Sequence, residues 1–324
     1  MSPEPAPVDR FRENLDALSE ASDRLGIAVS GGPDSVALLL LAAAARPGNI
    51  EAATVDHDLR DGSREEALAV AHLCDRLEVP HAILTVDWPV KLETAIQERA
   101  RTERYRLLAE WARTRSLDAL VVAHHADDQA ETLLMRLSRG AGVRGLAAMR
   151  GRSRVPGGTL PLLRPLLSWR RVDLEQVCAQ SGVQALEDPS NSDTRFERVR
   201  VRQAMAEADW LDRGAVAASA AHLADAEDAL DWAANGEWSR SVSEEAAEIL
   251  YSPAGAPAEI ERRLIARAIL SLAEEGDPKS LRSRELDPLF STLRAGGTAT
   301  LRGVLCKGGE QWRFSKAPPR KTIA

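Results

Sequence analysis

Residues 24–46 read RLGIAVSGGPDSVALLLLAAAAR, and this stretch decides the fold. The alternating apolar residues from Leu25 to Val29 predict a buried strand. The run from Pro33 to Ala45 predicts a helix with proline in its first turn. The turn between the two lies in SGGPDS, positions 30–35, whose last three residues already belong to the helix. A strand that passes directly into a helix is the opening unit of an α/β fold.

The SGGPDS segment predicts a phosphate site. Amides at the start of a helix have no partner within the helix, and they attract anions together with the helix dipole. Glycines allow close backbone approach, and serines add hydroxyl donors. It is not the Walker loop, because the chain has no Gly-Lys pair. The carboxylate of Asp34 indicates either a divalent cation beside the phosphates or a helix cap. The expected binding residues are Ser30, Gly31, Gly32, Pro33, Asp34 and Ser35.

The segments that follow predict a doubly wound parallel sheet. Strands are expected at residues 50–55, 81–86 and 117–123, and helices at residues 63–77 and 92–115. Ser63 and Glu66 are expected to form a capping box. Ligands of such sheets bind at the carboxyl ends of the strands. Three loops are therefore expected at one edge: SGGPDS, DHDLRDG at residues 56–62 and AHHADDQAET at residues 123–132.

These loops carry acids and histidines that allow more than one interpretation. The side chains are Asp34, Asp56, His57, His124, His125, Asp127, Asp128 and Glu131. Clusters of His and Asp hold two metal ions in many phosphohydrolases. An ATP-dependent activating enzyme needs Mg²⁺ beside the pyrophosphate, and Asp34 and Asp128 are the residues expected to share it. We prefer the second interpretation because only it uses the SGGPDS segment. Helix capping is the simpler alternative for Asp127 and Asp128.

An arginine-rich stretch follows these loops. Residues 136–171 hold nine arginines and no Asp or Glu, although the whole chain has a net charge of −7. Guanidinium groups pair with phosphates and stack on bases, so an RNA partner is expected. The GAGVRG segment at residues 140–145 matches a dinucleotide fingerprint, but it follows a helix, is not expected to start another, and is discounted. The expected RNA contacts are Arg139, Arg144, Arg164, Arg198 and Arg202.

Length and composition bound the architecture. With 324 residues the chain is long enough for two domains, expected at residues 1–208 and 209–324. The second is expected to be smaller and mostly helical, with a helix at residues 258–275 and one or two strands near the end. Trp312 and Phe314 there are candidates for base stacking or for core packing. No apolar run approaches the ~20 residues of a membrane span and no signal peptide is evident, so a cytoplasmic protein is expected.

Taken together, the motifs resemble those of the tRNA(Ile)-lysidine synthetases, a family of PP-loop ATP pyrophosphatases. The resemblance covers most of residues 20–205 and lies in SGGPDS, VDHDLR with SREEA, ARTERY, AHHADDQAETLLMRLSRGAG, RPLL and EDPSN. It implies an adenine nucleotide alpha hydrolase-like fold and an ATP-dependent ligase. Such enzymes adenylate the ring carbonyl oxygen of the wobble cytidine in tRNA(Ile) with anticodon CAU. Free lysine then displaces AMP, which changes decoding from AUG to AUA.

The resemblance also implies roles for individual residues. Asp34 would hold Mg²⁺, and Asp128 would share the metal or orient the lysine amine. Arg101 or Arg104 would offset charge on the α-phosphate, and exposed solubilising charge is the alternative for each. ATP contacts are also expected at Asp56 and His57. The implied partners are the tRNA and free lysine, and the resemblance is compatible with a homodimer.

Some features separate this chain from the family pattern and from rival functions. Val199 follows Arg198 where the family has asparagine, which leaves the tRNA role of that segment open. A tRNA thiolase of the same superfamily would need paired cysteines or an iron–sulfur cluster, whereas the three cysteines lie far apart. A two-metal phosphohydrolase and a pure RNA-binding module stay open as rival functions of different classes.

Overall fold

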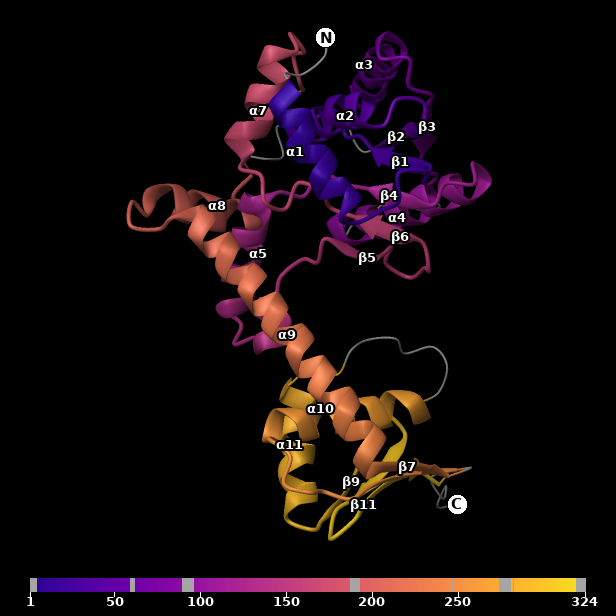
Figure 1. Ribbon diagram of the computed structural model, residues 1–324, viewed down its shortest axis with the longest axis vertical. Coiled ribbons are helices and arrows are strands. Elements are labelled where there is room, and N and C mark those ends of the chain that lie inside the picture. The colour runs from indigo at the N-terminus through magenta and orange to yellow at the C-terminus, as the bar shows by residue number, and fades with distance from the viewer. Residues whose placement is uncertain are drawn as a thin grey trace. The chain divides into compact units, whose positions relative to one another are not determined.

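The computed structural model describes residues 5–58, 62–88, 96–186, 193–245, 247–273, 281 and 283–318. The chain divides into two compact units, one of residues Met1–Arg139 and Ala147–Ala221 and the other of residues Gly140–Leu146 and His222–Ala324, both drawn in Figure 1. One division falls inside a long helix, α9 (Arg213–Ser241), and not at residue 208. The functional division into a catalytic and a tRNA-binding domain stays a prediction.

The first unit contains a six-stranded sheet. Its strands are β1 (Leu25–Ala28), β2 (Ile50–Asp56), β3 (His81–Thr85), β4 (Ala119–Val121), β5 (Arg152–Arg154) and β6 (Pro161–Leu163), in the order β3-β2-β1-β4-β6-β5. All neighbouring pairs are parallel except β5 with β6. The doubly wound parallel sheet is confirmed. The sequence pattern does not predict β5 and β6, which have only three residues each.

Helices cover both faces of this sheet. The helices of this unit include α1 (Pro5–Asp16), α2 (Pro33–Ala45), α3 (Ser63–Arg76), α4 (Ile96–Thr114), α5 (Ala126–Leu137), α7 (Arg171–Gln180) and α8 (Glu197–Glu207). Of these, α2, α3 and α4 pack directly on the strands, and α8 packs on α5. On one face α1 and α7 pack against α2, as Figure 1 shows, and α2 is buried along most of its length. On the other face Tyr105 and Trp111 of α4 share a core cluster with Leu120 of β4. Residues 92–95 of the predicted helix at 92–115 lie outside the described residues.

Two local predictions near the strand ends are wrong. Ser63 does not form a capping box with Glu66, because Gly62 is the N-cap residue and the Ser63 hydroxyl donates to Asp56 Oδ1 at 2.7 Å. A carboxylate accepts such a bond strongly, so the serine is tied to the end of β2. A short helix, α6 (Val143–Leu146), also follows Gly140, where the sequence predicts none.

The second unit combines helices with an antiparallel sheet. Its elements after α9 are β7 (Val242–Glu245), β8 (Glu248–Tyr251), α10 (Ala258–Leu272), α11 (Ser283–Arg294), β9 (Thr298–Leu301), β10 (Val304–Lys307) and β11 (Trp312–Lys316). The sheet has five strands, and three of them, β9, β10 and β11, lie in the glycine-rich end where one or two were expected, so that expectation is wrong. Trp312 and Phe314 are buried in the core of this unit, which supports core packing over base stacking. No helix in the described ranges is long and apolar enough to cross a membrane.

Candidate active site

A cavity of about 620 Å³ lies at the carboxyl ends of β1, β2 and β4. Described residues of all three loops line it: Ser30 and residues 32–35 of SGGPDS, Asp56 and His57, and residues 123–125 with Asp128. The predicted contact Gly31 is not among the lining residues, and residues 59–61 of the DHDLRDG loop lie outside the described residues. Leu108, Val122 and Phe196 add apolar surface, whereas Arg104 and Arg202 add positive charge. A site of this kind suits a ligand with one flat apolar part and one anionic part.

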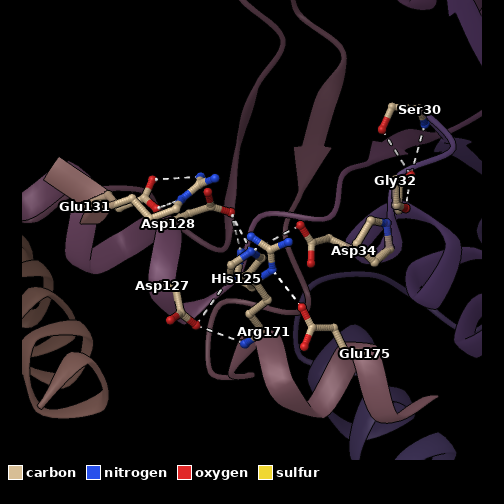
Figure 2. A network of polar contacts seen from close by, with 12 residues as sticks. Ser30, Gly32, Asp34, His125, Asp127, Asp128, Glu131, Arg171 and Glu175 are labelled. Carbon is tan, nitrogen blue, oxygen red and sulfur yellow. Dashed lines mark hydrogen bonds and ion pairs between the residues drawn. The ribbon is translucent and has the colours of Figure 1, made fainter. Parts of the chain in front are cut away.

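The SGGPDS loop is braced from within by Ser35. The Ser35 hydroxyl accepts a hydrogen bond from the Ser30 amide at 3.1 Å and donates to the Gly32 carbonyl at 2.9 Å. Figure 2 shows these contacts of the loop. The carbonyl of Gly31 accepts from the Leu186 amide at 3.0 Å, so a segment far along the chain also fixes the loop. Ser35 therefore shapes the loop, while Ser30, which is exposed, keeps its hydroxyl near the cavity.

Gly32 lies where a ligand can approach the backbone closely. Its φ of −70° is open to any residue, and a Cβ built on it would meet only Ser30 Oγ, at 3.8 Å. The space above Gly32 is therefore cavity and not protein. Among the described residues, none accepts a hydrogen bond from the amides of Gly32 or Asp34. Amides in this position at the start of α2 suit a phosphate group.

His125 stands at the centre of a carboxylate cluster, shown in Figure 2. Its Nε2 lies 3.4 Å from Asp34 Oδ2 and 3.5 Å from Asp128 Oδ2. Its Nδ1 lies 3.6 Å from Asp127 Oδ2. Burial by itself lowers the pKa of His125, but the contacts with Asp127 and Asp34 outweigh burial and raise the pKa to about 10. A proton on both ring nitrogens of His125 would offset the charge of these three carboxylates.

The acids of this cluster differ in how many of their oxygens are engaged. Asp34 Oδ1 is buried without a hydrogen-bond partner. Asp128 uses both oxygens, one with Arg198 at 2.7 Å and the other with the His125 amide at 3.0 Å. Asp127 accepts from the Arg171 amide at 2.9 Å. Mg²⁺ commonly binds one or two carboxylates together with phosphate oxygens, so the free oxygen of Asp34 fits that ion and Asp128 fits it less well.

Glu131 joins α5 to α8. It is only 2% exposed and accepts from Arg198 Nε at 2.6 Å and from Arg202 Nε at 2.7 Å. Prediction from sequence assigned it no role in the ATP-dependent reaction. Two spacings in the sequence were available as signals. Glu131 lies three residues after Asp128, which places both on one face of the same helix, and Arg198 and Arg202 are four residues apart, which places both on one face of another.

The predicted nucleotide-binding residues of β2 and α4 have different surroundings. Asp56 and His57 line the cavity, and Asp56 Oδ1 also accepts from the Asp58 amide at 3.0 Å. Burial, and after it the charge of Arg104, lowers the pKa of His57. Arg104 lines the cavity and pairs with no carboxylate among the described residues. Arg101 is exposed and lies over the Tyr105 ring at 5.2 Å.

The predicted RNA contacts fall into three groups. Arg139 is 61% exposed and pairs with Glu197, and Arg144 is 65% exposed and lies 3.4 Å from Glu227. Arg198 and Arg202 belong to the Glu131 cluster already described. Arg164 is only 8% exposed, which does not support the predicted RNA contact.

The comparisons with known proteins agree with this geometry. The PP-loop domain family matches residues 7–208. A tRNA(Ile)-lysidine synthase of Novosphingobium aromaticivorans is 46% identical over 319 residues, which cover 97% of this chain and 95% of that protein. One of Zymomonas mobilis is 40% identical and covers 96% of this chain and 94% of its own. The chain belongs to the tRNA(Ile)-lysidine synthase family. Members of this family are ATP-dependent ligases.

A solved structure shares the fold of this lysidine synthase family member. The U34-tRNA thiolase NcsA from Methanococcus maripaludis, solved with its [4Fe-4S] cluster, superposes with a TM-score of 0.56 at 16% identity, over 68% of this chain and 77% of that one. The likeness concerns the fold alone. In this chain Cys74, Cys178 and Cys306 are all buried and free, and none lines the cavity.

Val199 is the residue that departs from the lysidine synthase pattern. It lies in α8 and is 8% exposed. Its side chain therefore packs inside the protein.

Proposed function

We propose that this protein adenylates the wobble cytidine of tRNA(Ile) with anticodon CAU and then joins free lysine to it. In the first step the ring carbonyl oxygen bonds to the α-phosphorus of ATP, and pyrophosphate leaves with the electron pair of the broken bond. In the second step the lysine side-chain nitrogen bonds to the ring carbon, AMP leaves, and the amine gives up a proton. The observation that carries the proposal is the open space over Gly32 beside the unpartnered oxygen of Asp34.

The SGGPDS loop would hold the triphosphate tail. Ser30, Gly32 and Asp34 line the cavity, where the amides of Gly32 and Asp34 and the Ser30 hydroxyl would bind phosphate oxygens and Asp34 Oδ1 would bind Mg²⁺. Asp128 would share the metal only after releasing Arg198 or His125. When bound, Mg²⁺ would neutralise phosphate charge and favour the departure of pyrophosphate.

Arg104 and Asp128 both line the cavity and would assist different steps of the reaction. Arg104 lines the cavity without a carboxylate partner among the described residues, so its charge is available for the α-phosphate. Arg101 is exposed on the same helix and would contribute at longer range. Asp128 has a side chain 15% exposed, and its carboxylate would orient the amine of lysine.

The tRNA would meet exposed arginines outside the cavity. Arg139 and Arg144 are the two predicted contacts with well-exposed guanidinium groups, and each pairs with one carboxylate that a phosphate would replace. Arg198 and Arg202 would shape the pocket through Glu131. We also propose that the protein works in the cytoplasm. A homodimer stays a prediction, which light scattering with and without tRNA measures.

Mass spectrometry of nucleosides tests this function. The purified protein is incubated with tRNA(Ile), ATP, Mg²⁺ and lysine, and lysidine is expected together with pyrophosphate and AMP in equal amounts. Release of inorganic phosphate without lysine would favour a phosphohydrolase instead. Binding of tRNA without any product would favour an RNA-binding module.

A further inference from the structure

His124 is held in one orientation by an arginine from the neighbouring strand. His124 follows β4 and Arg164 follows β6, and these two strands pair in parallel. Arg164 Nε donates to His124 Nδ1 at 3.2 Å. Arg164 is itself fixed, because its Nη1 donates to the Arg150 carbonyl at 2.9 Å and to Ser153 Oγ at 2.8 Å. Few conformations of the imidazole ring satisfy these bonds.

The Arg164 bond determines which ring nitrogen carries hydrogen. A guanidinium group can only donate, so Nδ1 must present its lone pair. A neutral imidazole then carries its hydrogen on Nε2. Burial and, after it, the charge of Arg164 lower the pKa of His124 to about 2, which agrees with a neutral ring. Within the described part of the chain Nε2 has no hydrogen-bond partner, yet it is not sealed from solvent, and His124 lines the cavity.

We propose that His124 is a catalytic residue whose Nε2–H donates to a non-bridging oxygen of the α-phosphoryl group during adenylation, and that Arg164 is its positioning residue. This inference rests on the proposed function. β4 lies next to β1, so His124 borders the loop that would hold the triphosphate tail. The bond changes are those already given, and His124 keeps its proton throughout.

A neutral donor suits this position for an electrostatic reason. His125 next to it is surrounded by carboxylates, and a second cation there would attract those carboxylates in place of the substrate. A neutral N–H binds weakly to the ground state and more strongly as negative charge grows on the phosphoryl oxygens. The fixed tautomer thus supplies a donor that needs no reorganisation when the reaction begins.

The first test measures pyrophosphate release in a single turnover with tRNA and without lysine. We expect His124→Ala to slow this step about 10²-fold or more while the KM for ATP changes little. His124→Gln places an amide N–H near the position of Nε2, and it should recover at least about tenfold of that loss. His72→Gln, at an exposed histidine of α3, is the matched control. Equal rates for His124→Ala and wild type would overturn the proposal.

The second test uses the two diastereomers of ATP with sulfur at the α-phosphorus. Sulfur is a poor hydrogen-bond acceptor, so the wild type should react more slowly with the diastereomer whose sulfur replaces the oxygen that accepts from His124. In His124→Ala this diastereomer should cause no such slowing, because the donor is absent. Comparing Mg²⁺ with Cd²⁺ removes the part of the effect that arises from metal coordination. If His124→Ala slows the reaction but the sulfur effect of both diastereomers stays as in the wild type, the donor acts elsewhere and the proposal fails.

The third test observes the tautomer directly. Nitrogen-15 spectra of the histidine-labelled protein should show His124 with hydrogen on Nε2 and none on Nδ1, and Arg164→Met should remove this preference. A charged ring, or hydrogen on Nδ1, in the wild type contradicts the inference even if Arg164→Met fails to fold. Lysidine formation by the wild type is measured in the same preparation. Its absence would refute the proposed function, whereas its presence with a negative result for His124 refutes only this inference.

Discussion

At the scale of single residues, the two adjacent glycines of the phosphate loop serve different purposes. Gly31 has a φ of +89°, and a Cβ there would lie 3.0 Å from Leu186 Cδ1. Gly31 is therefore required by the protein's own conformation. Gly32 has an ordinary φ and open space above it, so the protein alone gives no reason for glycine. The triphosphate that we propose binds here would supply that reason.

Substitution of these glycines by alanine should separate folding from binding. Gly32→Ala should leave the Tm nearly unchanged but weaken ATP binding about tenfold, equal to ~1.4 kcal/mol, because the methyl group occupies ligand space. Gly31→Ala should lower the free energy of unfolding by about 1–2 kcal/mol through backbone strain. Calorimetry measures both quantities. Normal ATP affinity in Gly32→Ala would show that phosphate does not pass close to this residue.

Substitutions of Asp34 and Asp127, which contact different ring nitrogens of His125, should have different effects. Asp34→Asn should lower pyrophosphate release about 10²-fold and raise the Mg²⁺ concentration required, because Oδ1 has no protein partner and is the oxygen proposed for the metal. It should cost less stability than Asp127→Ala, because among the described residues the only contact that it weakens is that of Oδ2 with His125. Asp127→Ala should cost about 1–3 kcal/mol of stability, because the Arg171 amide loses its acceptor. Thermal unfolding and magnesium titrations distinguish the two. An Asp34→Asn enzyme with the wild-type magnesium requirement would remove Asp34 from the metal site.

At the scale of elements, the middle of α5 and the first half of α8 are joined by one buried carboxylate. Glu131 engages Arg198 and Arg202, and Arg198 also reaches Asp128. These contacts fix α8 beside the cavity, where Phe196 at its start contributes to the lining. The position of α8 thus depends on polar contacts more than on its own apolar face, since only Val199 and Met205 of this helix are buried.

Glu131→Gln should loosen α8. The amide loses the charge that both arginines need, and we expect a loss of about 2 kcal/mol in stability. Hydrogen exchange of the α8 amides should accelerate more than that of the amides in α2. Glu207→Gln, at an exposed acid at the end of the same helix, is the control and should change neither. Unchanged exchange in Glu131→Gln would mean that apolar packing alone holds α8.

Local patterns in the sequence were sufficient for part of this architecture. β1 and α2 lie close to their expected bounds because an apolar run, two glycines and a proline are all local signals. β5 exists through pairing with β6, and β7 is exposed and rich in glutamate, so neither shows an apolar period. In the site, Asp34 and Asp56 could be placed because they follow strands. The environments of His124 and Glu131 depend on arginines 40 and 67 residues away, which no local pattern reveals.

At the scale of the whole molecule, an acidic protein must bind a polyanion through a local surface. The net charge is −7, whereas residues 136–171 carry nine arginines and no acid. Several of these are committed to the protein itself: Arg164 is buried, and the Arg171 side chain pairs with Glu175 at 3.0 Å. The surface available to RNA is therefore smaller than the count of arginines indicates.

Arg139→Ala should weaken tRNA binding by removing one phosphate contact. The affinity should fall for tRNAs of any sequence, and the slope of log K against log salt concentration should decrease by about 1. Filter binding over a range of salt concentrations measures both. Arg113→Ala, at an exposed arginine of α4, should leave them unchanged. Equal slopes for Arg139→Ala and wild type would place Arg139 outside the RNA footprint.

The short segment Gly140–Leu146 has a consequence for dissecting this protein. It groups with the second unit although the residues on both sides of it group with the first, so the backbone passes between the units after Arg139, Leu146 and Ala221. Within that second unit Arg144 pairs with Glu227. A fragment truncated at residue 208 would keep the arginine and discard its glutamate. Each unit therefore consists of two separate segments of the chain, and a single truncation does not yield either unit intact.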